Sequence, residues 1–188
     1  MLKWELAKRA PKVKILVNAA GYGRMGRVED GDLPGETGMV RLNCEALCGV
    51  TQITLPYMAD HGRILLFGSA AGFLPQPGFA VYAAAKAFVV SFGRALNVEL
   101  KKRDIVVTTV CPGPVRTEFF ETEGMEGDIP FYKRLVMAEP KRVVKKALRD
   151  SMMGKSVSVY GWMMKGFWLM CKVVPHEALL RLQDCEKR

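Results

Sequence analysis

Short apolar runs alternate along this chain with longer segments in which apolar residues recur every three or four positions. The short runs have the length of strands and are rich in aliphatic and β-branched residues, at positions 13–17, 64–67, 105–110 and 157–160. Helical spacing marks the longer segments, at about 37–58, 82–102 and 139–150. This alternation of strand and helix predicts an α/β fold with a parallel sheet.

Glycine, proline and aspartate residues are expected to separate these elements. Gly62 would break the chain between the first long helix and the next strand, and Asp104 would turn the second helix into its strand. Residues 1–9 read as the end of a helix, 27–35 as a loop and 118–130 as a second loop. The helix expected at 139–150, which is rich in lysine and arginine, would end near Gly154, before the last strand.

Right-handed crossovers place the C-terminal ends of parallel strands at one edge of the sheet. The residues that follow three of the expected strands are Asn18, Ser69 and the pair Pro112 and Gly113. Open α/β sheets bind their ligands at this edge, so we expect these residues to border a common site.

The composition is that of one globular domain over residues 1–188, with nearly half of the residues hydrophobic. The five cysteines form no C-x-x-C pair and read as buried, reduced thiols, which favours a cytoplasmic protein. The two histidines have no partner at metal-ligand spacing, so no metal site is expected. The first nine residues are amphipathic and charged and do not resemble a signal peptide.

The net charge of +9 raises the question of a polyanionic partner. Much of the positive charge lies in the segment at 139–150, where lysine and arginine alternate with apolar residues at helical spacing. This pattern is typical of a solvated helix face, and stacking aromatics are missing from it. Nucleic-acid binding is therefore not expected.

The C-terminal tail, residues 161–188, begins with an apolar stretch of tryptophan, methionine and phenylalanine. It is too short to span a bilayer and is interrupted by Lys165 and Lys172. We expect it to form a lid on the substrate side or to pack in a dimer. A helix lying in a membrane interface is the alternative that stays open.

Three residues suggest chemistry on a carbonyl or alcohol oxygen. Tyr82 and Lys86 lie one turn apart on the same face of the second long helix, where the lysine cation favours the phenolate. Such a tyrosine can pass a proton to or from that oxygen, and Ser69, at a strand tip, can hold it by a hydrogen bond. A serine hydrolase is a weaker alternative, because Ser69 lacks the G-x-S-x-G context.

These residues resemble the short-chain dehydrogenase/reductase family. The Tyr-x-x-x-Lys motif of that family falls on Tyr82 and Lys86, and its serine, thirteen positions upstream, on Ser69. Its Asn-Asn-Ala-Gly motif appears as 18–21, with Ala19 in place of the second asparagine, and Asn43 matches the fourth member of its catalytic tetrad. The segment that borders the nicotinamide matches here at Pro112, Gly113, Val115 and Thr117.

The resemblance implies an NAD(P)-dependent oxidoreductase that interconverts a ketone and a secondary alcohol on an apolar substrate. The implied catalytic residues are Asn43, Ser69, Tyr82 and Lys86. Lys86 would also bind the nicotinamide ribose, and Asn43 would hold a helix kink and a water. The implied cofactor-binding residues are Asn18, Ala20, Gly21, Tyr82, Lys86, Pro112, Gly113, Val115 and Thr117. NADP is the expected form of the cofactor, and the resemblance implies a homodimer, or a higher oligomer, through the two long helices.

One part of the family pattern has no counterpart here. Members begin with a strand and a Gly-rich turn that approaches the cofactor pyrophosphate. The only similar cluster, Gly21 to Gly26, reads G-x-G-x-x-G but leads into a loop rather than a helix. We therefore expect a partial Rossmann-like, doubly wound parallel sheet that lacks the first two or three β-α units.

Three expectations follow from that missing part. The strand at 13–17 would become an exposed sheet edge with few charged residues to protect it. Tight cofactor binding is not expected without the Gly-rich turn. A catalytically inactive fragment or pseudoenzyme is then the alternative to a working oxidoreductase.

Overall fold

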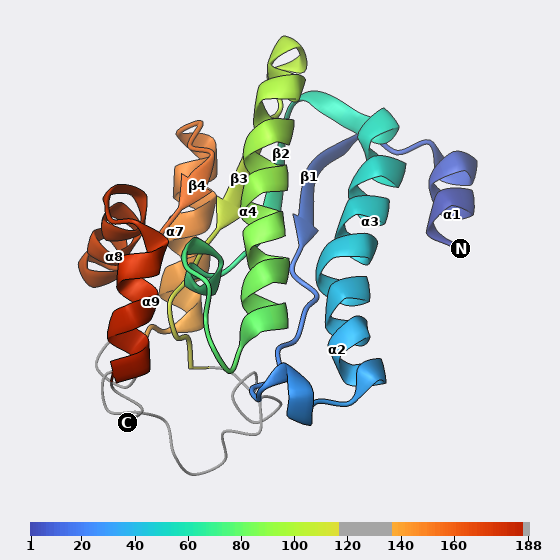
Figure 1. The fold of residues 1–188 in the computed structure, drawn as a ribbon. Coiled ribbons are helices and arrows are strands. Elements are labelled where there is room, and N and C mark those ends of the chain that lie inside the picture. Colours follow the sequence, from blue (N-terminus) through green and yellow to red (C-terminus); the bar gives the residue numbers. More distant parts are fainter. Residues whose placement is uncertain (117–136, 186–188) are drawn as a thin grey trace.

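The computed structural model describes residues 1–116 and 137–185, and in them four parallel strands form one sheet (Figure 1). The strands follow one another in the sheet in chain order: β1 (Val13–Asn18), β2 (Met58–Phe67), β3 (Val106–Val110) and β4 (Val157–Ser158). The prediction of an α/β fold with a parallel sheet is confirmed.

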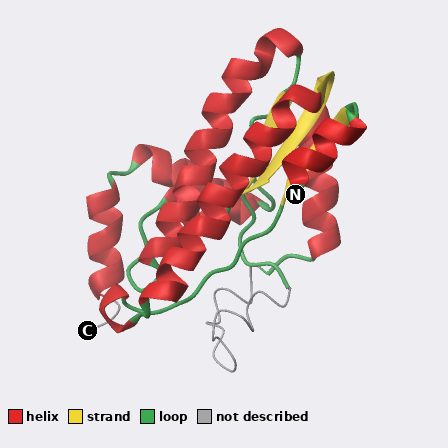
Figure 2. Cartoon of the chain, turned by 90° about the vertical axis from the view of Figure 1, so that its right-hand side faces the viewer, coloured by secondary structure: helices red, strands yellow, loops and turns green. Residues whose placement is uncertain are grey.

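Helices cover both faces of the sheet, and in the view of Figure 2 the strands lie between them. The longer helices are α1 (Leu2–Arg9), α2 (Leu33–Val40), α3 (Leu47–Thr54), α4 (Ala80–Glu99), α7 (Pro140–Met152), α8 (Trp162–Val173) and α9 (His176–Cys185). Alternate residues of β2 face opposite layers: Ile64 and Leu66 pack with α3 and α4, whereas Leu65 packs with α7. This is the doubly wound arrangement.

The first long helix begins earlier than the sequence pattern indicated. Helix α2, the π-helical turn η2 (Arg41–Ala46), α3 and the 3₁₀ turn η3 (Leu55–Tyr57) follow one another without a gap. The start lies at Leu33 because the Asp32 carboxylate accepts a hydrogen bond of 2.9 Å from the Gly35 backbone N–H and caps the helix. Assigning the last residues of 27–35 to a loop was therefore wrong.

Gly62 does not separate helix from strand, because β2 already begins at Met58. Val13 pairs with Met58 but Ile15 pairs with Arg63, so the residues between form a bulge on β2. His61, at φ 61°, gives this bulge its left-handed turn. The glycine in the pattern marked a bulge in the strand rather than its start.

The second half of the chain follows the predicted order. Helix α4 continues into the 3₁₀ turn η5 (Leu100–Arg103), and Asp104, at φ 51°, turns the chain into β3. Gly154, at φ 75°, follows the end of α7. Strand β4 is shorter than the predicted 157–160, and the loop expected at 118–130 lies outside the described residues.

Helix α4 lies very close to the sheet at one point. A Cβ on Gly93 would stand 2.1 Å from the Thr109 hydroxyl oxygen of β3, so only glycine allows this approach. Val89 and Leu96, one turn to either side, are buried against Ile64, Leu66 and Val107. This contact fixes the height and rotation of the helix that carries Tyr82 and Lys86.

Strand β1 forms one edge of the sheet, as expected, and β4 forms the other. Leu16 points into the core beside α3, whereas Ile15 and Val17 on the opposite face are half exposed, at 53% and 50%. In the described part of the chain, neither a helix nor a strand covers that face of β1.

The tail forms α8 and α9, which lie on the same side of the molecule as α7 and β4 (Figure 1). Within residues 1–116 and 137–185, no helix is long and apolar enough to cross a membrane.

Asp150 joins α7 to β4 from a buried position. Its carboxylate accepts hydrogen bonds from the Lys146 and Lys155 ammonium groups, the latter at 2.9 Å, and from the Ser158 hydroxyl at 2.7 Å. Burial raises the pKa of Asp150, but these hydrogen bonds outweigh it and bring the pKa to about 2. The ionised carboxylate is thus the form that stabilises this corner of the fold.

We expect Asp150→Asn to lower the free energy of unfolding by about 1–3 kcal/mol near neutral pH. The folded pKa of about 2 lies below the unfolded value of 3.8, so this stabilisation is complete above pH 3.8 and is lost as pH falls toward 2. Urea unfolding at several pH values measures it. The exposed Asp30, as Asp30→Asn, is the matched control, and a wild-type-to-Asp150→Asn difference that stays constant down to pH 2 contradicts the assignment.

Candidate functional site

The C-terminal ends of three strands meet at one edge of the sheet. Asn18 of β1 pairs with Leu66 of β2, and Phe67 pairs with Val110 of β3. The segments that leave these strands therefore start side by side, as parallel topology requires. The candidate site lies where they meet α4.

Ser69 follows β2 and begins the 3₁₀ turn η4 (Ala70–Phe73). Its hydroxyl oxygen accepts a hydrogen bond of 3.1 Å from the Ala71 N–H, which fixes the side-chain direction and leaves the hydroxyl proton for another acceptor. The Ala70 N–H donates to the Pro112 carbonyl oxygen at 2.8 Å. This bond joins the serine turn to the segment after β3.

Tyr82 and Lys86 lie in the first half of α4, and both are buried, at 6% and 5% exposure. The lysine nitrogen lies 5.6 Å from the centre of the tyrosine ring. Phe79 stacks on that ring at 4.3 Å, and Ala71 of the serine turn belongs to the same packed cluster. The tyrosine, the lysine and the serine turn are thus neighbours in space.

The Lys86 ammonium group donates a hydrogen bond of 2.9 Å to the carbonyl oxygen of Phe67, two residues before Ser69. Burial lowers the pKa of Lys86 to about 8, against the opposing effect of Cys44 and Cys111. Burial also raises the pKa of the Cys111 thiol to about 12, so this neighbour is uncharged. Lys86 is therefore a cation whose charge can change just above neutral pH.

The cysteines differ in part from their expected environment. Cys111 and Cys171 are buried, but Cys44 and Cys48 are only half buried, on the helix that faces α4. These four cysteines are free thiols.

Asn43 lies in the π-helical turn η2 and is 1% exposed. Its amide nitrogen donates to the Tyr22 carbonyl oxygen at 2.8 Å, while its Oδ1 has no hydrogen-bond partner among the described residues. A Cβ on Gly21 would stand 2.3 Å from this oxygen and 3.2 Å from the Lys86 nitrogen. The two atoms are therefore close enough for one water molecule to bridge them.

The residues at 18–21 divide into two roles. Asn18 donates through its amide nitrogen to the Thr51 hydroxyl at 2.8 Å, which ties the end of β1 to α3. Ala20 is exposed, and Gly21 lies against Asn43 and Lys86. The structure thus brings Gly21 to the site and gives Asn18 a contact within the fold.

The segment after β3 is described as far as Arg116. A Cβ on Gly113 would stand 2.5 Å from the sulfur of Met164, so α8 packs directly on this glycine. Val115 forms an isolated bridge with Ala138, just before α7. Thr117, the last expected residue of the set, lies outside the described residues.

The sequence reasoning missed two residues at this site. A Cβ on Gly72 would stand 2.6 Å from the Lys86 carbonyl carbon, so the serine turn touches the backbone of α4 directly. The sequence shows a glycine, Gly72, three residues after Ser69, but it does not show that this glycine contacts α4. Met164 gave no signal, because its contact with Gly113 is made only by the tertiary fold.

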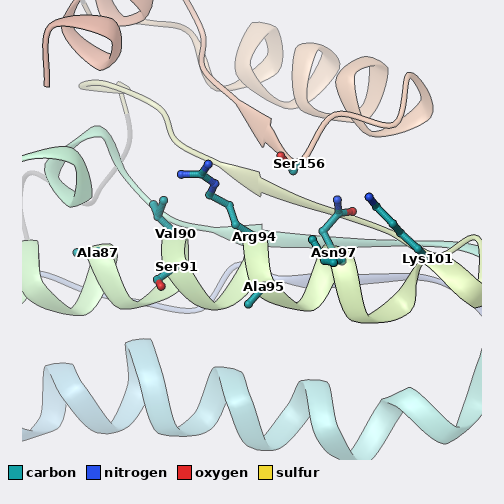
Figure 3. A pocket seen from close by; sticks show the side chains of 9 residues that line it. Ala87, Val90, Ser91, Arg94, Ala95, Asn97, Lys101 and Ser156 are labelled. Atoms are coloured by element: carbon teal, nitrogen blue, oxygen red, sulfur yellow. The ribbon is translucent and has the colours of Figure 1, made fainter. Parts of the chain in front are cut away.

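A groove of about 560 Å³ runs along another flank of α4 (Figure 3). Arg94 of α4 and Lys101 of η5 project into it, with Ser156 across from them. The Asn97 side chain there is engaged in accepting a hydrogen bond of 2.9 Å from the Val107 N–H. Ser69, Tyr82 and Asn43 do not line this groove, so it is separate from the candidate site.

The described arrangement combines a hydroxyl donor, a phenol and a buried cation. Ser69 and Tyr82 carry hydroxyl groups, which can donate a proton, and Lys86 supplies positive charge at a buried position. Such a set stabilises negative charge on a substrate oxygen and can protonate it.

Comparison with known proteins gives the family. The short chain dehydrogenase family matches residues 4–126, about two thirds of the sequence, and the chain belongs to this family. Sulfoacetaldehyde reductase 2 of Chromohalobacter salexigens is 39% identical over 119 residues, which is 61% of this chain and 47% of that protein. Very-long-chain 3-oxoacyl-CoA reductase-B of Danio rerio is 36% identical over 103 residues, or 54% of this chain and 33% of that protein.

Solved structures give the same fold. A short-chain dehydrogenase from Sphingobium yanoikuyae, in complex with NADPH, has a TM-score of 0.75 at 25% identity, over 97% of this chain and 70% of that one. One from Burkholderia cenocepacia, in complex with NADP, has a TM-score of 0.78 at 19% identity, over 95% of this chain and 73% of that one. The chain spans a third to a half of the length of the curated relatives it matches.

We expect Gly72→Ala to lower the free energy of unfolding by about 1–3 kcal/mol, because the added methyl group meets backbone atoms of α4 that cannot rotate away. Gly49→Ala in α3 is the matched control, since its Cβ would meet nothing within 4 Å and alanine favours the helix. Urea unfolding measures both. Equal stability of the two variants would show that the turn is not in contact with α4.

Lys86 should make stability depend on pH in the alkaline range. Its folded pKa of about 8 lies below the ordinary 10.5, so between these values the unfolded chain binds more protons and stability rises with pH. Relative to Lys86→Met, the wild type should gain up to about 3 kcal/mol across this range, measured by urea unfolding. If the free energy of unfolding changed with pH in the same way in both proteins, burial would not lower the pKa of Lys86.

Proposed function

We propose that this chain carries the catalytic part of an NAD(P)-dependent oxidoreductase that interconverts a ketone and a secondary alcohol. Membership of the short-chain dehydrogenase family supports an oxidoreductase. The observation that carries the specific proposal is the buried Lys86, which is bonded to the Phe67 carbonyl between Tyr82 and the serine turn.

In this proposal Tyr82 is the general acid and base. Its phenol gives a proton to the carbonyl oxygen during reduction, while Ser69 holds that oxygen by a hydrogen bond. The Lys86 cation lowers the energy of the phenolate that remains. Asn43 Oδ1, buried and facing Lys86, would hold the water that returns the proton from solvent.

A bound nicotinamide cofactor would supply the hydride. The residues that would hold it are Asn18, Ala20, Gly21, Tyr82, Lys86, Pro112, Gly113, Val115 and Thr117. One observation fits such a group: among the described residues, the buried acceptor Asn43 Oδ1 has no hydrogen-bond partner and lies beside Lys86. NADP is the form we propose, in line with the neighbours whose structures contain NADPH or NADP.

The substrate side supports an apolar ligand. Helix α8 closes the site through Met164 on Gly113, and Phe73 of the serine turn packs against Phe167 and Trp168. We propose that the tail, residues 161–188, acts as an apolar wall of the substrate site. The relatives named above act on an aldehyde and on very-long-chain oxoacyl groups, by their names.

The proposal also includes a homodimeric assembly and a cytoplasmic location. Val40 at the end of α2 and Phe88 and Val98 on α4 are exposed, which favours a homodimer through the two long helices. The free thiols favour a cytoplasmic location.

A catalytically inactive fragment or pseudoenzyme that lacks the pyrophosphate-binding half is the second candidate. It is favoured by the segment after Gly26, which forms the 3₁₀ turn η1 (Val28–Asp30) instead of the long helix that a pyrophosphate-binding fingerprint opens. A serine hydrolase is not proposed, because His61 pairs with Asp104 at 2.6 Å in the β2 bulge and His176 lies on α9.

We expect Tyr82→Phe to lower the turnover of apolar ketones with NADPH at least ~10²-fold, as for a lost general acid. NADPH oxidation measures turnover, and quenching of nicotinamide fluorescence measures binding in the same samples. Tyr57→Phe, in η3 at the opposite end of β2, is the matched control. Near-normal turnover in Tyr82→Phe would contradict the mechanism, whereas a wild type with neither saturable NADPH binding nor turnover would favour the second candidate.

A further inference from the structure

Helix α8 has one side that is part of the core. Met164, Phe167, Trp168 and Cys171 all pack into the cluster that contains the serine turn and Cys111. This side accounts for fewer than half of the apolar residues of the helix. The other apolar residues of α8 do not pack into this cluster.

The outer side of α8 is apolar as well. Trp162, Leu169 and Val173 are exposed, at 82%, 60% and 75%, and Met163 and Met170 extend the same strip. With ~100° per residue, the five side chains cover about a third of the helix circumference. Gly166 lies within this strip, and a Cβ on it would meet nothing within 4 Å. The strip therefore faces open space in the described structure.

The polar part of α8 is narrow and entirely basic. Lys165 and Lys172 lie next to each other on the helix, between the strip and the core side, and Lys172 stacks over Trp168 at 3.6 Å. The helix contains no acidic residue, and the whole chain has a net charge of +9. The surface that would cover the strip should thus bring negative charge.

A second copy of this helix does not meet that need. In a symmetric contact the same strip would lie on both sides, and the lysines beside it would find no carboxylate on the partner helix. An anionic lipid bilayer offers both properties: an apolar interior for the strip and phosphates for the lysines. Trp162, at the end of the helix, is the residue type that favours the boundary between them.

We propose that α8 docks on the surface of an anionic lipid bilayer. The helix has twelve residues, about 18 Å, and so lies flat at the surface rather than across a ~30 Å core. Its strip enters the boundary between headgroups and acyl chains, and Lys165 and Lys172 contact the phosphates. Because the inner side of α8 packs on Gly113, this orientation brings the candidate site close to the bilayer. The docking itself does not depend on the proposed reaction.

Sedimentation with vesicles tests the docking directly. We expect the protein to bind vesicles of phosphatidylcholine with about 30% phosphatidylglycerol, and to bind pure phosphatidylcholine at least about tenfold more weakly. Leu169→Glu with Val173→Glu should abolish binding, and Lys165→Gln with Lys172→Gln should lower it about tenfold or more.

The matched control places the same charges on an apolar surface far from α8. Leu2 and Trp4 on α1 are exposed, at 42% and 62%, and α1 and α8 lie at opposite sides of the molecule (Figure 1). Leu2→Glu with Trp4→Glu should bind vesicles like the wild type. Circular dichroism checks the fold of each variant.

A second measurement needs no destabilising change. Trp162 emission should shift to the blue when wild-type protein meets the anionic vesicles, and Trp162→Phe should lack this shift. Binding that survives the Leu169 and Val173 changes, or an absent blue shift, would overturn the proposal. So would a dimer that dissociates on those changes and never binds vesicles, because the strip would then serve a second copy.

Discussion

The hydrogen bond from the Lys86 ammonium group to the Phe67 carbonyl joins the two parts from which the site is made. Phe67 ends β2 and leads into the serine turn, and Lys86 comes one turn after Tyr82 on α4. A cation is costly to bury unless its donors are used, and this bond uses one of them. It therefore fixes the tyrosine relative to the serine turn and keeps positive charge where the proposed chemistry needs it.

Three glycines, which have no side chain, allow the elements of the candidate site to come this close. A Cβ on Gly21, Gly72 or Gly93 would overlap Asn43, the backbone at Lys86 or Thr109, respectively. Each glycine brings a different element against α4: the loop after β1, the turn after β2 and strand β3. Helix α4 thus packs closely against three elements, which leaves Tyr82 and Lys86 little freedom to shift.

The C-terminal tail connects the site with the outer surface. One side of α8 closes the segment after β3 through Met164, and the other side exposes an apolar strip bordered by lysines. In the proposed enzyme, this helix would line the site of an apolar substrate and would also contact the bilayer in which such a substrate dissolves. Both properties follow from an amphipathic pattern in which only a narrow sector is polar.

The sequence by itself determined the strand and helix order, the family, and the residue types of the site. Periodicity and the spacing of Ser69, Tyr82 and Lys86 are local properties, so they can be read without coordinates. The bulge at Gly62, the early start of α2 at its Asp32 cap, and the contacts of Gly72 and Met164 were decided by the tertiary structure. Strand pairing and close packing bring together residues that are far apart in the chain, and no local sequence pattern indicates these contacts. The contacts nevertheless determine how the predicted site residues are oriented toward one another.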